Sequence, residues 1–195
     1  MATIAGIILA AGSSQRMGEP KQLLAYRGTT LLNVVITAAE ASQLDHVVVV
    51  TGANAGAIQD SASVERAVVV HNPDFELPNM ASVVVGAGAV DADAFVTLPA
   101  DTPGITTEEI DAVVERWHAD APWAAITEYR DRSGHPFLVS RAALNEAASV
   151  EGAKVLWRFL GDDHSGRVIR MTVDRPAPLD VNTPGDYEAL LGDEQ

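Results

Sequence analysis

The sequence predicts an α/β fold whose sheet is mostly parallel. Short apolar runs rich in β-branched residues alternate with helical patterns through the first 120 of the 195 residues, an order that is typical of right-handed βαβ units. Most of these runs show no polar alternation, as expected of strands buried on both faces. Hydrophobic residues make up 47% of the chain but aromatic residues only 5%. The core must therefore rest on aliphatic side chains, which suits a parallel sheet covered by helices.

The individual elements follow from these patterns. The expected strands are the apolar segments 4–9, 46–51, 67–70, 94–98, 123–128, 136–139 and 168–173. The expected helices are the segments 30–42, 55–62, 80–89, 107–119, 141–148, 153–160 and 184–191. Thr106 with Glu109 predicts a capping box, and Thr183 before Pro184 predicts another helix start. The polar stretch 129–135 breaks the alternation, so we expect a loop or hairpin there and an antiparallel strand after it.

Length and charge limit the class of protein. The chain fits one domain over residues 1–195, because no repeat or linker divides it. With 27 acidic and 13 basic residues its formal net charge is −14, so neither a nucleic acid nor a membrane is expected as partner. The absence of cysteine excludes disulfides, thiolate metal sites and cysteine nucleophiles. The apolar residues 1–12 lack a basic n-region and are interpreted as a buried strand of a soluble cytoplasmic protein.

The loop at residues 10–21 has the composition of an anion-binding turn. Residues 1–39 carry three cations and a single acid, although the chain as a whole is acidic. The loop opens with small residues and serines, whose N–H and hydroxyl groups could surround an anion; these are Ala10, Ala11, Gly12, Ser13 and Ser14. Arg16 and Lys21 add positive charge for phosphate oxygens. An ordinary solvated turn is the alternative.

The two common phosphate-binding motifs do not fit this loop. Gly18 is followed by Glu-Pro rather than by Lys and Ser or Thr, so the loop is not a Walker A motif. It is not a Gly-x-Gly-x-x-Gly dinucleotide motif either. Two more polar loops, 72–82 and 99–104, follow predicted strands. Because ligands bind at the carboxyl ends of strands in open α/β sheets, we expect the site where the three loops meet.

Several motifs together resemble one known family. The segment Leu9-Ala-Ala-Gly-Ser-Ser-Gln-Arg-Met-Gly-Glu-Pro-Lys-Gln-Leu-Leu24 resembles the signature of the MobA-like NTP transferases. Segments 79–88, 98–103, 134–136 and 180–186 resemble further signatures of that family. The combination looks most like the molybdenum cofactor cytidylyltransferase branch. The resemblance implies a single-domain, three-layer α/β/α Rossmann-like nucleotidyltransferase fold.

The resemblance also implies a reaction. An NMP group, with CTP as the donor, would pass to the terminal phosphate of molybdopterin or the molybdenum cofactor, and pyrophosphate would leave. Lys21 would contact the α-phosphate region, and Arg16 would contact the β- and γ-phosphates. Residues 9–14, which begin with Leu9, would surround the nucleotide. Because the acceptor is already an anion, no general base is needed and catalysis rests on positioning and charge.

The same resemblance implies a Mg²⁺ site. Asp101 follows a strand and would hold the metal, unless it caps the next helix or turn. Asp180 and Asn182 alternate on an extended segment, so both could reach the metal. The family often carries an acid at the position of Asn182, and which of the two residues is the second ligand stays open. A turn with a helix cap is the alternative for either.

The remaining site residues lie in two other motifs. Ser82 and Gly86 are expected beside the base or ribose, although close helix–sheet packing explains such a glycine equally well. His135 is expected on the acceptor side, with a surface loop histidine as the alternative.

Three other functions stay open from the sequence. They are a guanylyltransferase that uses GTP on the same cofactor, a transferase with a sugar phosphate or other small phosphate as acceptor, and a non-catalytic chaperone that holds the molybdenum cofactor. A molybdoenzyme or its maturation chaperone is a candidate protein partner.

Overall fold

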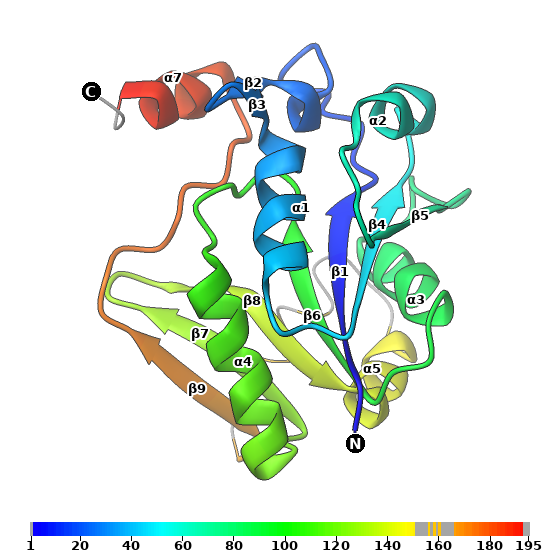
Figure 1. The fold of residues 1–195 in the computed structure, drawn as a ribbon, viewed down its shortest axis with the longest axis vertical. Helices are drawn as coiled ribbons and strands as arrows, with labels where there is room; N and C mark the ends of the chain where they lie inside the picture. The colour runs from blue at the N-terminus through cyan, green and yellow to red at the C-terminus, as the bar shows by residue number, and fades with distance from the viewer. Residues whose placement is uncertain (1, 151–155, 157, 159, 161–165, 193–195) are drawn as a thin grey trace.

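A seven-stranded mixed sheet forms the centre of the fold (Figure 1), in the order β5-β4-β1-β6-β8-β7-β9. The computed structural model describes residues 2–150, 156, 158, 160 and 166–192. The strands of the sheet are β1 (Ile4–Ala10), β4 (His46–Thr51), β5 (Val68–His71), β6 (Ala94–Pro99), β7 (Ala124–Tyr129), β8 (Ser133–Ser140) and β9 (Val168–Val173). Only β8 runs antiparallel to its neighbours among these strands. The predicted parallel sheet with one antiparallel strand is therefore confirmed.

Helices cover both faces of the sheet (Figure 1). Helices α1 (Leu31–Ala41) and α4 (Thr107–Asp120) lie on one face, and α3 (Met80–Gly88) and α5 (Arg141–Ala148) lie on the other. Side chains alternate along β1, because successive Cβ atoms of a strand point to opposite faces. Ile4 and Ile8 belong to the core beneath α1 and α4, whereas Ala5 and Ile7 belong to the core beneath α3 and α5. The three-layer arrangement follows from this alternation.

Two helix starts match the predicted caps. The Thr106 hydroxyl accepts a hydrogen bond from the Glu109 N–H (3.3 Å), and the Glu109 carboxylate accepts one from the Thr106 N–H (3.0 Å), completing the capping box of α4. At α7 (Pro184–Gly192) the Asp186 N–H donates to the Thr183 hydroxyl (3.2 Å). Helix α2 (Ala55–Ser61) also lies where a helix was predicted. The helix predicted at 153–160 lies mostly outside the described residues.

Two small elements were not predicted. The 3-10 turn η1 (Lys21–Leu23) is followed by a hairpin of β2 (Ala25–Tyr26) and β3 (Thr29–Thr30). Strands of two residues are too short to show an apolar pattern. The hairpin nevertheless has a role, because it shares a small apolar cluster with the segment before α7; the cluster contains Leu24, Tyr26, Leu31, Val181 and Leu190.

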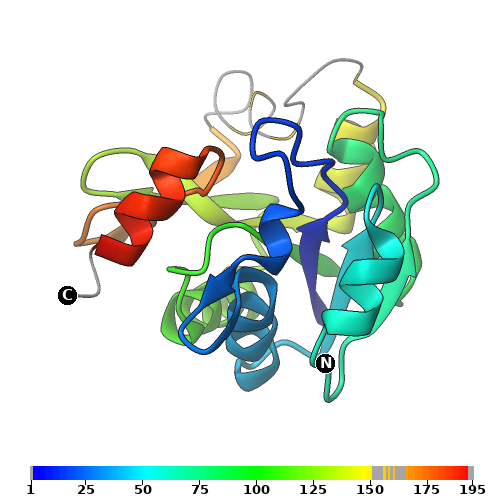
Figure 2. The same cartoon turned by 90° about the horizontal axis from the view of Figure 1, so that it is seen from above.

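The sheet has its topological switch point at β1. The chain passes from β1 to β4 and β5 on one side and returns to β6 on the other, and Leu9 of β1 pairs with Pro99 of β6. Ligands of open α/β sheets bind outside the carboxyl ends of such strands. Figure 2 looks down on this edge, where the loop after β1 and the segment leading into α7 both lie. Among the described residues, no helix has the length and apolar character needed to cross a bilayer.

Candidate functional site

Two adjoining cavities open at the carboxyl ends of β1 and β6. Their volumes are about 720 Å³ and about 230 Å³. Residues that line both are Leu9, Asn79, Pro99, Asp101, His135 and Asn182. All three loops that were expected to meet therefore contribute to one site. The start of β8 and the segment before α7 complete its walls.

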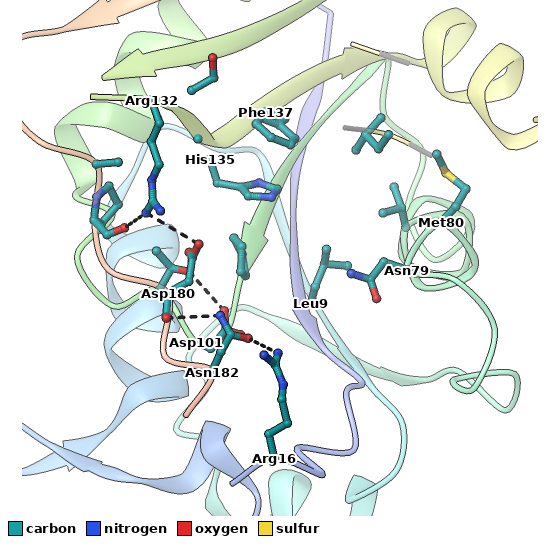
Figure 3. A pocket seen from close by; sticks show the side chains of 18 residues that line it. Leu9, Arg16, Asn79, Met80, Asp101, Arg132, His135, Phe137, Asp180 and Asn182 are labelled. Atoms are coloured by element: carbon teal, nitrogen blue, oxygen red, sulfur yellow. Dashed lines mark hydrogen bonds and ion pairs between the residues drawn. The ribbon is translucent and has the colours of Figure 1, made fainter. Parts of the chain in front are cut away.

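A cluster of two cations and two oxygen ligands lies at the junction of the cavities. Lys21 forms an ion pair with Asp101, and its ammonium group donates to Asn182 Oδ1 at 3.0 Å. Arg16 Nη2 donates to the same Asn182 oxygen at 3.2 Å (Figure 3). The side chains of Lys21 and Asp101 are only 14% and 18% exposed, so their attraction is screened less than that of a surface pair. The predicted phosphate-binding and metal-binding residues thus meet at one point.

The loop after β1 is held in shape by a residue that sequence analysis missed. Gln22 is 2% exposed, and its side-chain amide donates to the carbonyl groups of Ala10 (3.2 Å) and Gly12 (3.0 Å). Its Oε1 accepts from the Ser14 hydroxyl (3.2 Å), which in turn accepts from the Lys21 N–H (3.1 Å). Gln22 therefore fixes the backbone on both sides of the loop and the start of the turn that carries Lys21. Gln22 lies within the quoted segment 9–24, directly before an apolar pair, but neither feature marked it as a residue that shapes the loop.

The small residues of this loop differ in where they lie. Ala11 and Gly12 line the smaller cavity. Ala10 is buried beneath the loop, and Ser13 is exposed, and neither lines a cavity. Ser14 adopts a positive φ of 53° and uses its hydroxyl inside the loop. The side chains of Ser13 and Ser14 therefore do not reach the site in this structure.

For Gly86 the structure favours the packing alternative over the nucleotide role. Gly86 lies in α3 against the sheet, where an added Cβ would come within 2.7 Å of Ile7 Cγ2 and 2.9 Å of Val50 Cγ2. It lines neither cavity. The glycine is needed for close helix–sheet packing. Ser82, one turn earlier, does line the smaller cavity and accepts a hydrogen bond from Asn72 at 3.0 Å.

The carboxylates near the junction have distinct partners. Thr102 donates to Asp180 Oδ1 at 2.7 Å, and its hydroxyl also lies 3.2 Å from Asp101 Oδ1. The helix after Asp101 is capped by Thr106, so Asp101 is not the cap of that helix. The Asp186 carboxylate accepts from the N–H groups of Asn182 and Thr183, and these hydrogen bonds lower the pKa of Asp186.

The donor set fits a hard divalent cation. Carboxylate and amide oxygens suit Mg²⁺ and Mn²⁺, and Asp101 and Asn182 present such oxygens to one shared ammonium group. Within the described part of the chain, no group of three or more His, Asp or Glu residues could hold a metal. A site with few protein ligands is the type in which Mg²⁺ completes its shell with phosphates and water.

His135 lies on β8 rather than in a surface loop. Its ring stacks on Phe137, with the ring centres 3.8 Å apart, and it lines both cavities. Nδ1 lies 2.9 Å from the Thr97 carbonyl oxygen, and burial lowers the pKa of His135. A neutral ring that donates from Nδ1 to this carbonyl has an unprotonated Nε2. The His135–Pro136 peptide bond is cis.

Several residues line the larger cavity although the sequence assigned them no role, among them Asn79, Thr102 and Arg132. Asn79 and Thr102 lie within quoted motifs, so their position was accessible in principle. Arg132 lies in the polar stretch that predicted only a loop or hairpin, and nothing in its sequence context marks it.

The fold is that of a nucleotidyl transferase of known structure from Methanothermobacter thermautotroptrophicus, with a TM-score of 0.82 and 24% identity, covering 98% of this chain and 97% of that one. The family model of the MobA-like NTP transferase domain matches residues 6–168. The chain belongs to this family.

Relatives within the family carry different names. The chain is 28% identical over 190 residues to the molybdenum cofactor cytidylyltransferase of Escherichia coli K12, covering 96% of this chain and 95% of that protein. It is 29% identical over 121 residues to a probable molybdenum cofactor guanylyltransferase of Bacillus mycoides, covering 60% and 58%. It is also 28% identical over 166 residues to nicotine blue oxidoreductase of Paenarthrobacter nicotinovorans, covering 80% and 81%. Family membership alone therefore does not fix the substrate.

Solved structures resemble the chain over nearly its full length. The structure of Rv0371c from Mycobacterium tuberculosis H37Rv has a TM-score of 0.87 and 33% identity, and 98% of each chain is covered. A complex of the same mycobacterial protein with manganese has a TM-score of 0.81 and 31% identity, covering 98% of this chain and 99% of that one.

Proposed function

We propose that this chain transfers CMP from CTP to the terminal phosphate of molybdopterin or the molybdenum cofactor. The observation that carries the proposal is the convergence of Lys21, Arg16, Asp101 and Asn182 at the mouth of a cavity at the switch point. An acceptor phosphate oxygen forms a bond to the α-phosphorus, and the bond from that phosphorus to the bridging oxygen of pyrophosphate breaks. The acceptor is already anionic, so no general base is required.

The residues act by position and charge. Lys21 neutralises charge at the α-phosphate and Arg16 at the β- and γ-phosphates, while the backbone of residues 10–14 surrounds the triphosphate. Such preorganised donors lower the barrier because they need no rearrangement when charge develops. Gln22 supports them by holding the loop carbonyls turned inward.

Asp101 and Asn182 are the residues that would hold Mg²⁺. A divalent cation bound there supplies further charge neutralisation for the triphosphate. We assign Asn182 rather than Asp180 as the second ligand, because Asn182 and Asp101 already share Lys21, whereas Asp180 Oδ1 accepts from Thr102. The manganese complex of the mycobacterial structure supports a divalent metal in the family.

The acceptor side of the cavity lies around His135. The unprotonated Nε2 of its neutral ring could accept a hydrogen bond from an N–H or O–H group of the acceptor. Ser82 and Leu9 line the nucleotide side. We place the reaction in the cytoplasm, with a molybdoenzyme or its maturation chaperone as the recipient of the product.

The identity of the base rests on the cytidylyltransferase of Escherichia coli as the relative matched over most of its length. GTP is the competing donor, supported by the guanylyltransferases that match over a shorter segment. A sugar phosphate or another small phosphate as acceptor, or a chaperone that binds the molybdenum cofactor without turnover, would use the same cavity.

Product analysis separates these functions. The protein is incubated with Mg²⁺, the molybdenum cofactor and CTP or GTP labelled at the α-phosphate, and the products are resolved by chromatography. We expect label from CTP in a cofactor dinucleotide. Label transferred only from GTP would favour the guanylyltransferase. Label transferred only to an added sugar phosphate would favour the other acceptor class, and tight cofactor binding without label transfer would favour the chaperone.

A further inference from the structure

The proposed reaction leaves one cation of the larger cavity without a role. Arg132 precedes β8, lines the cavity and has a side chain that is 48% exposed. Figure 3 shows it reaching toward Asp180 from the side of the cavity opposite Arg16, with Asp101 and Asn182 between the two arginines. The cavity therefore has a cation on each side of the oxygen ligands.

Arg132 is held in place but incompletely neutralised. Its Nη2 donates to the Pro178 carbonyl at 2.7 Å and forms a long ion pair with Asp180 Oδ2 at 3.8 Å, a separation too large for a hydrogen bond. Asp180 is engaged instead by Thr102 at 2.7 Å. Within the described residues, Nε and Nη1 of Arg132 make no hydrogen bond.

Neighbouring arginines of the same region differ from Arg132. Arg130 donates from Nε and Nη2 to the Asp174 carboxylate at 3.2 and 2.9 Å. Arg175 donates from the same two nitrogens to Glu109 at 2.9 and 2.8 Å. The guanidinium groups of Arg130 and Arg175 are therefore each occupied by a carboxylate of the protein, whereas the guanidinium group of Arg132 faces the cavity. A planar fork of this kind matches the oxygen geometry of a phosphate.

The proposed reaction favours a cation on the acceptor side of the cavity. The reaction brings an anionic acceptor against a triphosphate, inside a protein whose net charge is −14, so the acceptor is repelled unless its charge is neutralised. Arg16 is hydrogen-bonded to Asn182 and Lys21 is ion-paired with Asp101, and the proposed reaction assigns both cations to the triphosphate. We propose that Arg132 binds the phosphomonoester of the acceptor substrate, with Asp180 and the Pro178 carbonyl as its positioning groups. This inference rests on the proposed function.

Substitution of Arg132 tests the assignment. The probe is inorganic phosphate, titrated by calorimetry into protein saturated with Mg²⁺ and a non-hydrolysable CTP analogue, with acetate at equal ionic strength for comparison. We expect Arg132→Gln to weaken phosphate binding by roughly 10- to 100-fold, as expected for loss of charge-assisted hydrogen bonds. Binding of the CTP analogue should be unchanged. Arg130→Gln, which removes a nearby arginine outside the cavity, should behave as the wild type.

Kinetics provide a second readout. With the molybdenum cofactor as acceptor, Arg132→Gln should raise KM for the acceptor and leave KM for CTP unchanged, and Arg132→Lys should recover part of the loss. The inference is overturned if wild-type protein binds acetate as well as phosphate, or if Arg132→Gln weakens CTP-analogue binding as much as phosphate binding. Failure of the proposed function is seen separately, as an absence of nucleotidyl transfer by the wild-type protein with any acceptor.

Discussion

Lys21, the first residue of η1, forms an ion pair with Asp101, which lies two residues after the end of the parallel strand β6. The same ammonium group binds Asn182, so one cation organises the oxygen atoms that we assign to the metal. The two partners come from segments far apart in the sequence, and both are mostly shielded from solvent. Their pairing is the reason for treating loop, metal ligands and cavity as one site.

The metal assignment predicts different effects on Mn²⁺ affinity for substitutions at the two candidate ligands. Asn182→Asp adds negative charge beside Asp101 and should tighten Mn²⁺ binding by roughly threefold or more, because ligand charge raises divalent affinity. Asp180→Asn should change Mn²⁺ affinity by less than about twofold, because its carboxylate is occupied by Thr102. Titration of Mn²⁺ followed by electron paramagnetic resonance measures both. A larger loss in Asp180→Asn than in Asn182→Ala would reverse the assignment.

Substitution of Gln22 should disturb the loop after β1 without removing any charged group of the site. Gln22→Glu keeps the shape of the side chain but cannot donate to the carbonyl groups of Ala10 and Gly12. We expect the free energy of unfolding to fall by about 1–3 kcal/mol and CTP binding to weaken, because the buried carbonyl group of Ala10 and the part-buried one of Gly12 lose their donor. Gln15→Glu adds the same charge at an exposed position of the same loop. Equal effects of the two changes, in urea unfolding and nucleotide titration, would rule out this role.

Alanine substitutions at two glycines of α3 distinguish the effect of helix–sheet packing from the effect of helix propensity. Gly86→Ala gains helix propensity but presses its Cβ on Ile7 and Val50, so we expect a net destabilisation of about 1–3 kcal/mol. Gly88→Ala has nothing within 4 Å of the added Cβ and should be neutral or stabilise by up to about 1 kcal/mol. Thermal unfolding of both variants measures the difference. A stable Gly86→Ala protein with impaired nucleotide binding would restore the nucleotide role that the structure does not support.

The burial of His135 leads us to expect that the free energy of unfolding depends on pH. Burial lowers the pKa of His135 below its ordinary value of 6.5, so the ring stays neutral in the folded state while it gains a proton in the unfolded state. The free energy of unfolding should therefore decrease as the pH falls through about 6.5, by up to about 1.4 kcal/mol per pH unit. In His135→Gln, the free energy of unfolding measured with urea should change less steeply with pH between about 5.5 and 7.5, an interval that brackets the ordinary pKa of histidine. An identical slope in the variant would show that His135 is not the group responsible.

The layer architecture was predictable because it depends on local patterns. Buried β-branched runs and helix caps such as Thr106–Glu109 are properties of neighbouring residues. The start of β8 was placed three residues late, since Ser133 and Gly134 belong to the hairpin pairing with β7 although they carry no apolar pattern. Polar residues in a strand are recognised only once the partner strand is known.

Site residues could be predicted from the sequence where they were charged or polar residues within a family motif. Lys21, Asp101 and Asn182 stood in quoted motifs, and the structure brings them together. Gln22 and Arg132 were missed because their roles depend on carbonyl groups that the fold supplies, those of Ala10, Gly12 and Pro178. Backbone partners of this kind leave no trace in side-chain composition. For Gly86 the sequence left packing and nucleotide binding equally open, and only the position of the sheet beneath α3 favours packing.

The release of pyrophosphate by wild-type protein and by the variants Lys21→Ala and Asp101→Ala tests the central claim most directly. In the presence of CTP, Mg²⁺ and the molybdenum cofactor, we predict steady pyrophosphate release by the wild type. Each variant should lower kcat by about a hundredfold or more, the size expected when a preorganised charge at the reacting phosphate is removed. Wild-type rates of pyrophosphate release in both variants would contradict the account.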